Sequence, residues 1–426
     1  MHASTRPHHE HGPAREPAGA GATVEAARWY AVYAAASLAV TVLAGTWLRS
    51  AMLHPPLLGG HELRHAMHAH SHVALFGWTT MALFAFIVRA AGLDARWVRW
   101  HAHATGLATA AAFLGFLQLG YTTVTIIVAT LHVALWFAFA IGSWRSLRAI
   151  PGVARGCLRA ALCLLLVAGL GAMAPGIVRA RGVTDPWLLQ LSVELFLAPF
   201  LAGWLGLGAA GVLYARLAQP RHHRAVAWLL AAGALPSALL RVPAAAPSEW
   251  LPAVGRIGMA CVGAAAVLLA IDLLRTSRPL PLFRIAGAFA LLQGVAEIGA
   301  AAGATLSVLG NHQLKVAYLH LVLLGVVTPA LLGAVVCARV AVGRLAAAHA
   351  AGLLVTLAAV AELGLPPAAA LLATVGIGGG ALPIAALAGG ALSAAAILGM
   401  LLQAWRSLGA AGAATAGRRP ADAAAA

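Results

Sequence analysis

The chain has 426 residues, of which 62% are hydrophobic and only 9% are charged, and its mean hydropathy is +0.87. Ordinary soluble domains carry about 25% charged residues, so this composition excludes a soluble globular protein. The net charge of +16 is spread over short loops and forms no basic patch interleaved with aromatic residues, which argues against nucleic acid as a partner. The four cysteines form neither a CxxC nor a CxxCH motif, so disulfides and covalently attached haem are not expected.

Two polar tails enclose the apolar part of the chain. Residues 1–26 are rich in Pro, Gly and His and lack the apolar stretch of a cleaved signal peptide, so we expect a disordered cytoplasmic tail. Residues 406–426 form a similar tail rich in Ala, Gly and Arg. The transmembrane helical domain is predicted over residues 27–405.

Within this domain, twelve apolar stretches follow one another, and each is long enough as a helix to cross the roughly 30 Å hydrocarbon core of a bilayer. The predicted helices span residues 29–48, 68–91, 104–120, 122–142, 157–175, 187–214, 225–241, 250–271, 284–309, 316–338, 345–364 and 383–405. The segment 366–382 contains Pro366, Pro367 and three consecutive glycines, and it suits a loop, a half-helix or the start of the last span. The fold class predicted is all-α, a polytopic membrane protein with about twelve transmembrane helices.

The basic residues predict an orientation. Fifteen lie in loops that follow even-numbered helices, seven lie in loops that follow odd-numbered helices, three precede the first helix and three follow the last. By the positive-inside rule, both termini and the even-numbered loops are cytoplasmic in a bacterial-type inner membrane. The second, fourth, sixth and tenth helices then begin at the outer face.

Histidines gather where the second helix begins. Residues 54–78 read HPPLLGGHELRHAMHAHSHVALFGW. The spacings of four, three and four residues predict one helical stripe, formed by His61, His65, His68 and His72. His70 points away from this stripe. Ionisable residues inside an apolar span are costly unless they are paired or functional, so these histidines are candidate ligands.

Two further histidines lie inside predicted spans. His132 begins HVALWF in the fourth helix, and His320 begins HLVLLG in the tenth, where both sequences are similar to HVALFG at His72. A glycine follows five residues later in two of the three cases, Gly77 after His72 and Gly325 after His320. A missing side chain at this distance would leave room for a flat macrocycle. Two neutral imidazoles from different helices at similar depth suit axial ligation of haem iron, and His72 and His320 meet this requirement.

Carboxyl groups are sparse within the spans. Glu194 lies near the middle of the sixth helix and Glu297 near the middle of the ninth. Desolvation favours their protonated form, so they suit either a proton relay or hydrogen bonds between helices. Tyr318 lies two residues before His320 and suits either a hydrogen bond to a haem propionate or an anchor at the membrane interface.

The segments HAHSHVALFGW and YLHLVLLG, within a chain of about twelve helices, resemble the large-subunit superfamily of haem–copper oxidases and nitric oxide reductases. They are also similar to the NnrS-type haem–copper membrane proteins linked to the nitric oxide response. In that superfamily the second and tenth helices supply the histidines of a low-spin haem near the outer face. His72, or its neighbours His68 and His70, and His320 stand at the matching places. The resemblance therefore implies a b-type haem and a role in electron transfer or in binding nitric oxide or oxygen.

The chain departs from that pattern at the catalytic centre. Catalytic members carry a copper-binding histidine on helix 6, a histidine pair on helix 7 and a second histidine on helix 10. Here the sixth helix offers Glu194 but no histidine, the seventh has none within its span, and the tenth has only His320. His222 and His223 precede the seventh helix in a predicted cytoplasmic loop. The pattern thus indicates a relative with one haem and an incomplete binuclear haem–copper centre, so an oxidase or reductase activity is not supported.

Two other classes of function fit the sequence. A transporter or handling protein for Cu, Zn or Ni would gather the metal with the histidines between His54 and His72, and would pass it to His132 and Glu194. An accessory subunit of a respiratory complex would need no cofactor and would leave the histidines without a role. The interpretation as a haem protein predicts haem b as the cofactor, with copper as a second candidate. It also predicts a redox partner of the respiratory chain, besides the lipid bilayer.

Overall fold

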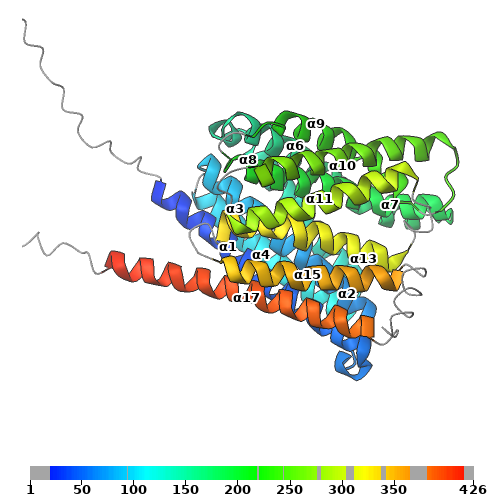
Figure 1. Cartoon of the computed structure of the whole chain (residues 1–426), viewed down its shortest axis with the longest axis horizontal. Coiled ribbons are helices and arrows are strands. Elements are labelled where there is room, and N and C mark those ends of the chain that lie inside the picture. The colour runs from blue at the N-terminus through cyan, green and yellow to red at the C-terminus, as the bar shows by residue number, and fades with distance from the viewer. Residues whose placement is uncertain are drawn as a thin grey trace, which may run out of the picture.

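Eleven helical segments of the described chain are long and apolar enough to cross a membrane, and they run side by side in one bundle (Figure 1). The computed structural model describes residues 20–93, 95–217, 220–242, 244–275, 280–303, 311–336, 342–364 and 381–416. Over these residues it contains helices and connecting turns but no strand, which confirms the all-α polytopic membrane fold. Most of the segment 366–382 lies outside the described residues.

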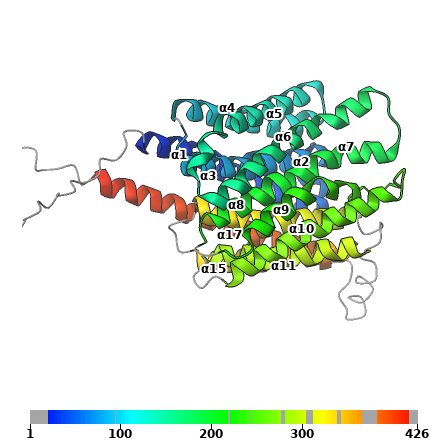
Figure 2. The ribbon, with the colours of Figure 1, turned by 90° about the horizontal axis from the view of Figure 1, so that it is seen from above.

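The helices follow the predicted spans closely. Their bounds are α1 (Ala20–Leu53), α2 (Leu63–His72), η2 (Val73–Thr79), α3 (Thr80–Ala91), α4 (Ala95–Leu119), α5 (Thr123–Ser143), α6 (Gly152–Ala180), α7 (Pro186–Ala198), η4 (Pro199–Leu207), α8 (Gly208–Tyr214), α9 (His223–Ala234), η5 (Pro236–Leu240), α10 (Trp250–Arg275), α11 (Pro281–Ala302), α13 (His312–His320), η6 (Leu321–Val327), α14 (Thr328–Leu331), η7 (Leu332–Val336), α15 (Gly343–Gly364) and α17 (Ala381–Ala416). Short 3₁₀ turns, η1 (Pro55–Leu58) and η3 (Ser146–Ala149), lie in two of the connections. In Figure 2, α4, α5 and α6 line one side of the bundle and α11 and α15 the opposite side.

The seventh predicted span is broken. Instead of a continuous helix over 225–241, the chain forms the 12-residue α9 and then the 3₁₀ turn η5. Pro236 has no N–H with which to continue the helical hydrogen bonding. The turn packs closely on α10, because a Cβ at Gly258 would come within 2.5 Å of the backbone nitrogen of Ser237.

Both ends of the described chain project from the same end of the bundle (Figure 1). This arrangement fits an even number of crossings. Helix α1 begins at Ala20, inside the predicted N-terminal tail, and α17 continues to Ala416, inside the predicted C-terminal tail. Both additions are rich in alanine, the strongest helix former, so these helices extend beyond the apolar spans.

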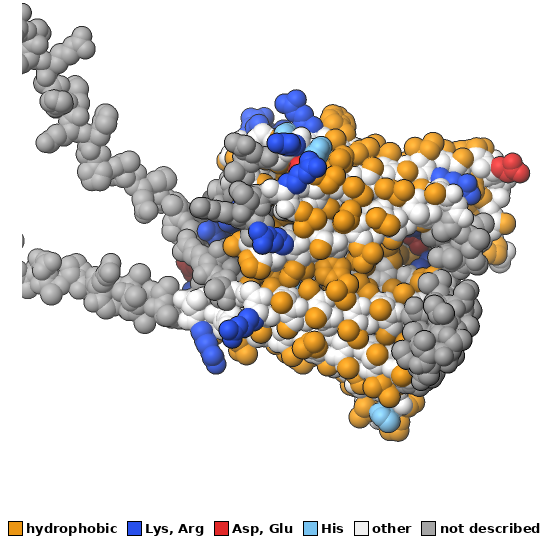
Figure 3. All heavy atoms as spheres, in the orientation of Figure 1, with side chains coloured by type: hydrophobic (Ala, Val, Ile, Leu, Met, Phe, Trp, Pro, Cys, Tyr) orange, Lys and Arg blue, Asp and Glu red, His pale blue; other side chains and the backbone are white. Residues whose placement is uncertain are grey.

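Hydrophobic side chains cover the middle of the helices on the face shown in Figure 3. Arginine and lysine side chains on that face gather mainly at the end from which α1 and α17 project. An apolar belt between more polar ends is the surface expected of a protein that contacts lipid around its waist.

Three of the long spans contain π-helical segments. Segment η2 starts directly after His72, η6 starts directly after His320, and η4 continues α7. A π-helix is wider than an α-helix, and short π-helical insertions occur often at functional sites. Two of the three therefore follow histidines that the sequence analysis singled out.

Two buried hydrogen bonds connect these three spans. Trp78 Nε1 in η2 donates to Thr328 Oγ1 in α14 at 2.9 Å, and Trp204 Nε1 in η4 donates to Thr80 Oγ1 in α3 at 3.1 Å. All four residues are almost completely buried. Each bond satisfies an indole N–H that would otherwise lie unpaired in the apolar interior.

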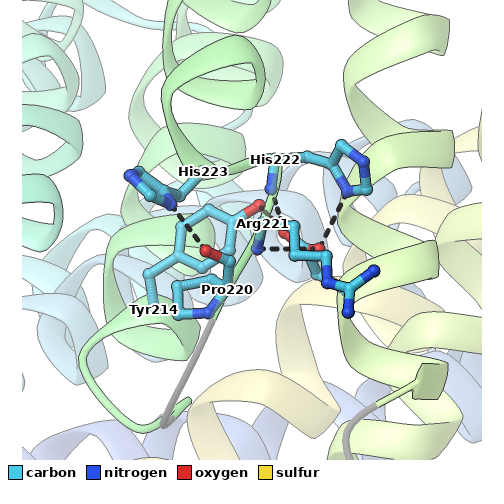
Figure 4. A network of polar contacts seen from close by, with 6 residues as sticks. Tyr214, Pro220, Arg221, His222 and His223 are labelled. Carbon is cyan, nitrogen blue, oxygen red and sulfur yellow. Dashed lines mark hydrogen bonds and ion pairs between the residues drawn. The ribbon is translucent and has the colours of Figure 1, made fainter.

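A carboxylate holds the connection before α9. Asp272 of α10 accepts hydrogen bonds from the backbone N–H groups of Arg221 and His222 at 3.2 and 3.0 Å, and from the hydroxyl of Tyr214 at 3.3 Å. The His222 Nδ1 lies 2.9 Å from the same carboxylate (Figure 4). The side chain of His223 turns to the carbonyl of Pro220 at 2.8 Å. The side chains of His222 and His223 are thus both engaged in hydrogen bonds at this connection.

We expect Thr328→Val to lower the free energy of unfolding by about 1–2 kcal/mol, because it leaves the Trp78 N–H without an acceptor inside the bundle. Thermal unfolding in mild detergent measures the change. Thr130→Val is the matched control, since the Thr130 hydroxyl bonds only to the Ile126 carbonyl on the exposed side of α5. Equal losses in the two variants would contradict the role of the Trp78 hydrogen bond.

Candidate functional site

Helix α2 presents its histidines on two faces. On one face, His65 lies against Gly120, and the rings of His68 and His72 lie 4.7 and 6.5 Å from the ring of Tyr121. All three therefore pack on the turn between α4 and α5. The predicted stripe holds for these three residues.

His61 does not belong to this face. It precedes α2, and its ring lies 6.2 Å from Trp47 of α1. Gly59 and Gly60 adopt positive φ angles of 58° and 89°, which turn the chain before the helix begins. The prediction of a four-histidine stripe was therefore wrong at His61, because helical periodicity does not extend through a turn.

His70 faces α1. A Cβ built on Gly45 of α1 would lie 3.0 Å from the Cε1 atom of His70. The absence of a side chain at Gly45 therefore lets the imidazole pack directly on α1. His70 and His320 interact electrostatically. The Nδ1 atom of His70 is buried and forms no hydrogen bond of ordinary geometry to the described residues, although the ring also interacts with the backbone of Thr41 in α1. His70 is thus the α2 histidine that the fold turns towards α1.

His320 has a defined tautomer. Its Nδ1 lies 2.7 Å from the carbonyl oxygen of Val316, and a carbonyl only accepts hydrogen bonds, so the proton resides on Nδ1. The lone pair of Nε2 remains for another partner. Metal-binding histidines are commonly oriented in this way. Arg49 of α1 lies within electrostatic range of His320.

His72 is directed elsewhere. Its Nδ1 donates to the carbonyl oxygen of His68 at 2.8 Å, and its ring stacks on Phe116 of α4 with ring centroids 4.0 Å apart. None of its ring contacts within the described chain involves α13. The fold therefore does not place His72 as it places His70 relative to His320.

His132 is completely buried among aromatic rings. The ring of Phe76 lies 5.0 Å away and that of Trp136 lies 5.6 Å away. Neither ring nitrogen of His132, nor the Nε1 of Trp136, has a hydrogen-bond partner among the residues that the structure describes. Phe76 also contacts His72 at 4.9 Å, so one aromatic ring touches both histidines.

The two glycines allow close helix packing. A Cβ at Gly77 would lie 2.7 Å from the Cβ of Ser37, and a Cβ at Gly325 would lie 2.8 Å from the Cβ of Phe289. Protein side chains thus fill the space in which the sequence analysis expected a macrocycle. These two glycines give no support to cofactor binding.

A buried polar network surrounds Tyr318, two residues before His320. The Tyr318 hydroxyl donates to Glu297 Oε1 at 2.5 Å, and Gln293 Nε2 donates to the same oxygen at 3.1 Å. The guanidinium of Arg241 donates to the Tyr318 hydroxyl at 3.0 Å and lies over its ring. Tyr318 therefore bonds within the protein.

Lys315 extends this network to the second predicted carboxyl group. Its Nζ lies 3.7 Å from Glu194 Oε1 and donates to the Arg241 carbonyl at 3.5 Å. Glu194 and Glu297 thus belong to one network, as a proton relay or an interhelical hydrogen-bond cluster would require. Sequence reasoning missed Arg241 and Lys315, although Lys315 is the only lysine in a chain whose other basic residues are arginine.

Histidines with a structural role are recognisable by their saturated rings. His101 Nδ1 pairs with the Tyr30 hydroxyl, and its Nε2 donates to the Leu135 carbonyl at 2.8 Å. His349 Nδ1 pairs with Ser393 Oγ at 2.8 Å, and its Nε2 donates to the Leu324 carbonyl at 3.0 Å. Such rings have no lone pair or proton left for a ligand.

Tyr121 closes the space beside His68 and His72. Burial raises the pKa of its hydroxyl, and the positive charge of Arg179 opposes this effect. Tyr121 therefore stays protonated at physiological pH and presents a neutral ring to both imidazoles.

Among the described residues, no group of three or more His, Cys, Asp or Glu side chains is arranged to hold a metal ion. Any metal bound by these residues would take at most two protein ligands from this set. Neither protein-family models nor curated proteins match the sequence.

Loss of Arg241 should destabilise the protein strongly. We expect Arg241→Ala to lower the free energy of unfolding by about 3–5 kcal/mol, because Glu297 and Glu194 lose a buried counter-charge. Thermal unfolding in detergent measures it. The control is Arg256→Ala, which removes an exposed arginine of α10 and should cost less than about 1 kcal/mol. Similar losses in both variants would show that the network contributes little.

Proposed function

We propose that this integral membrane protein binds a b-type haem, with His70 and His320 as the two axial ligands. The observations that carry the proposal are a buried Nδ1 atom of His70 without a hydrogen-bond partner among the described residues, and an Nε2 atom of His320 whose lone pair is left by the Nδ1 hydrogen bond to Val316. Haem iron of the bis-histidine type needs one imidazole on each side of the porphyrin plane.

The donor set suits this role. Because the proton of His320 resides on Nδ1, the lone pair of Nε2 is available to bind iron. His70 has a buried nitrogen without a hydrogen-bond partner, and Nε2 of His320 forms no hydrogen bond to the described protein. Gly45 leaves room for the His70 ring.

Positive charge near the pair supports the same cofactor. Arg49 of α1 lies within electrostatic range of His320. Haem carries two propionate groups, which arginine and lysine side chains bind well. The resemblance of the helix-2 and helix-10 segments to haem–copper oxidases points in the same direction.

Such a haem would supply one-electron chemistry. Two histidine ligands saturate the iron, so the pair favours electron transfer, with a redox partner of the respiratory chain, over binding of nitric oxide or oxygen. The chain's own contribution would be to hold the two imidazoles and to keep them away from water and lipid.

We further infer that both termini are cytoplasmic and that His70 and His320 lie in the outer half of the membrane. The excess of arginine in the even-numbered loops supports this orientation. A green fluorescent protein fused to the C-terminus should fluoresce, because it folds in the cytoplasm. Alkaline phosphatase at the same position should be inactive, and the reverse pattern would overturn the orientation.

The haem proposal is tested by absorption spectra of the purified protein, oxidised and reduced with dithionite. We expect sharp α and β bands and a pyridine haemochrome of b type in the unaltered chain. His320→Ala and His70→Ala should each abolish the bands or convert them to a high-spin spectrum. Because His72 contacts α4, His72→Ala is the matched control and should keep the low-spin spectrum.

Two results would overturn the assignment. Purified protein without iron would exclude haem. A spectrum that is lost in His72→Ala but kept in His70→Ala would place the iron on the other face of α2.

A further inference from the structure

A row of ionisable side chains follows the second face of α2, away from His320. It begins with Glu62, whose carboxylate lies 3.3 Å from the Nε2 of His65, and continues through His68 to His72. His65 packs on Gly120, and His68 and His72 pack on Tyr121, so all three imidazoles lie at the turn between α4 and α5. The proposed haem uses none of these residues, so they need a separate explanation.

His68 and His72 have the spacing of a chelating pair. Residues four apart on a helix lie on one face, so both imidazoles approach the same region. Both rings contact the edge or face of Tyr121, and both keep part of their surface accessible. Two histidines at this spacing on a helix form a common metal-binding unit.

The hydrogen bond within the pair prepares His72 as a ligand. Because Nδ1 of His72 donates to the carbonyl of His68, its Nε2 carries the lone pair. Neither this Nε2 nor the ring of His68 forms a hydrogen bond to the described protein. The saturated rings of His101 and His349 show how a purely structural histidine differs in this fold.

We propose that His68 and His72 form a binding site for a borderline divalent transition metal ion, Cu²⁺ or Zn²⁺, which His65 and Glu62 help to attract. Neutral imidazole suits both ions, and water can complete the coordination. The site stands independently of the haem, because it uses the opposite face of α2.

The test uses the full chain in detergent, with His2, His8, His9 and His11 replaced by alanine in every sample so that the N-terminal tail contributes nothing. Zn²⁺ affinity is measured by calorimetry, and Cu²⁺ is followed by electron paramagnetic resonance. We expect one ion per chain and nitrogen hyperfine splitting from two imidazoles. His68→Ala and His72→Ala should each weaken binding at least tenfold, a loss of about 1.4 kcal/mol or more.

Gln variants separate the loss of a ligand from misfolding of the Ala variants. His68→Gln and His72→Gln keep side chains of similar size and polarity but lack the imidazole, and they should lose the metal equally. An unfolding temperature equal to that of the parent chain shows that a variant keeps the fold. His61→Ala is the matched control, because the His61 ring packs on Trp47 of α1, and its metal affinity should not change.

The outcomes separate this proposal from the haem. Unchanged Zn²⁺ and Cu²⁺ affinity in both His72 variants would overturn the metal site, whatever the haem spectrum. Loss of metal binding in His70→Ala would also overturn it, because the ion would then lie on the first face. Loss of the haem spectrum in His70→Ala with metal binding retained would leave both proposals standing.

Discussion

A polar group inside this bundle must find its partner within the protein, because lipid offers none. Most of the fold obeys this constraint. Trp78 and Trp204 donate to threonines on neighbouring spans, and Asp272 binds the connection before α9. These bonds fix how the helices lie against one another. Against that background, a buried imidazole nitrogen without a partner is an informative exception, and His70 and His132 are the described histidines that show one.

Helical periodicity divides the histidines of α2 between two faces. Residues four apart share a face, whereas residues two apart lie about 200° apart around the axis. His68 and His72 therefore approach the turn between α4 and α5, while His70 approaches α1. One short histidine-rich helix can thus serve two separate sites. The separation also makes His70 and His72 natural controls for each other.

Hydropathy and composition predicted much of this architecture. The apolar spans appear at nearly the predicted places, since burial in lipid requires long apolar runs. The break at Pro236 and the π-helical segments were not predicted. Hydropathy averages over a window and does not register a single altered hydrogen bond. Arg241 was likewise counted only as a loop charge, although it lies buried between Tyr318 and the Glu194 side of the network.

The sequence by itself determined the class of protein, the spans and the set of histidines available as ligands, because these depend on local composition and on spacing along one helix. Only the tertiary structure decided which members of the set meet. His70, which the helical stripe excluded, packs on Gly45 of α1, and His61 packs on Trp47. Gly77 and Gly325 receive side chains of neighbouring helices where the sequence suggested open space. Such pairings depend on how distant helices pack, and no spacing within a single helix encodes them.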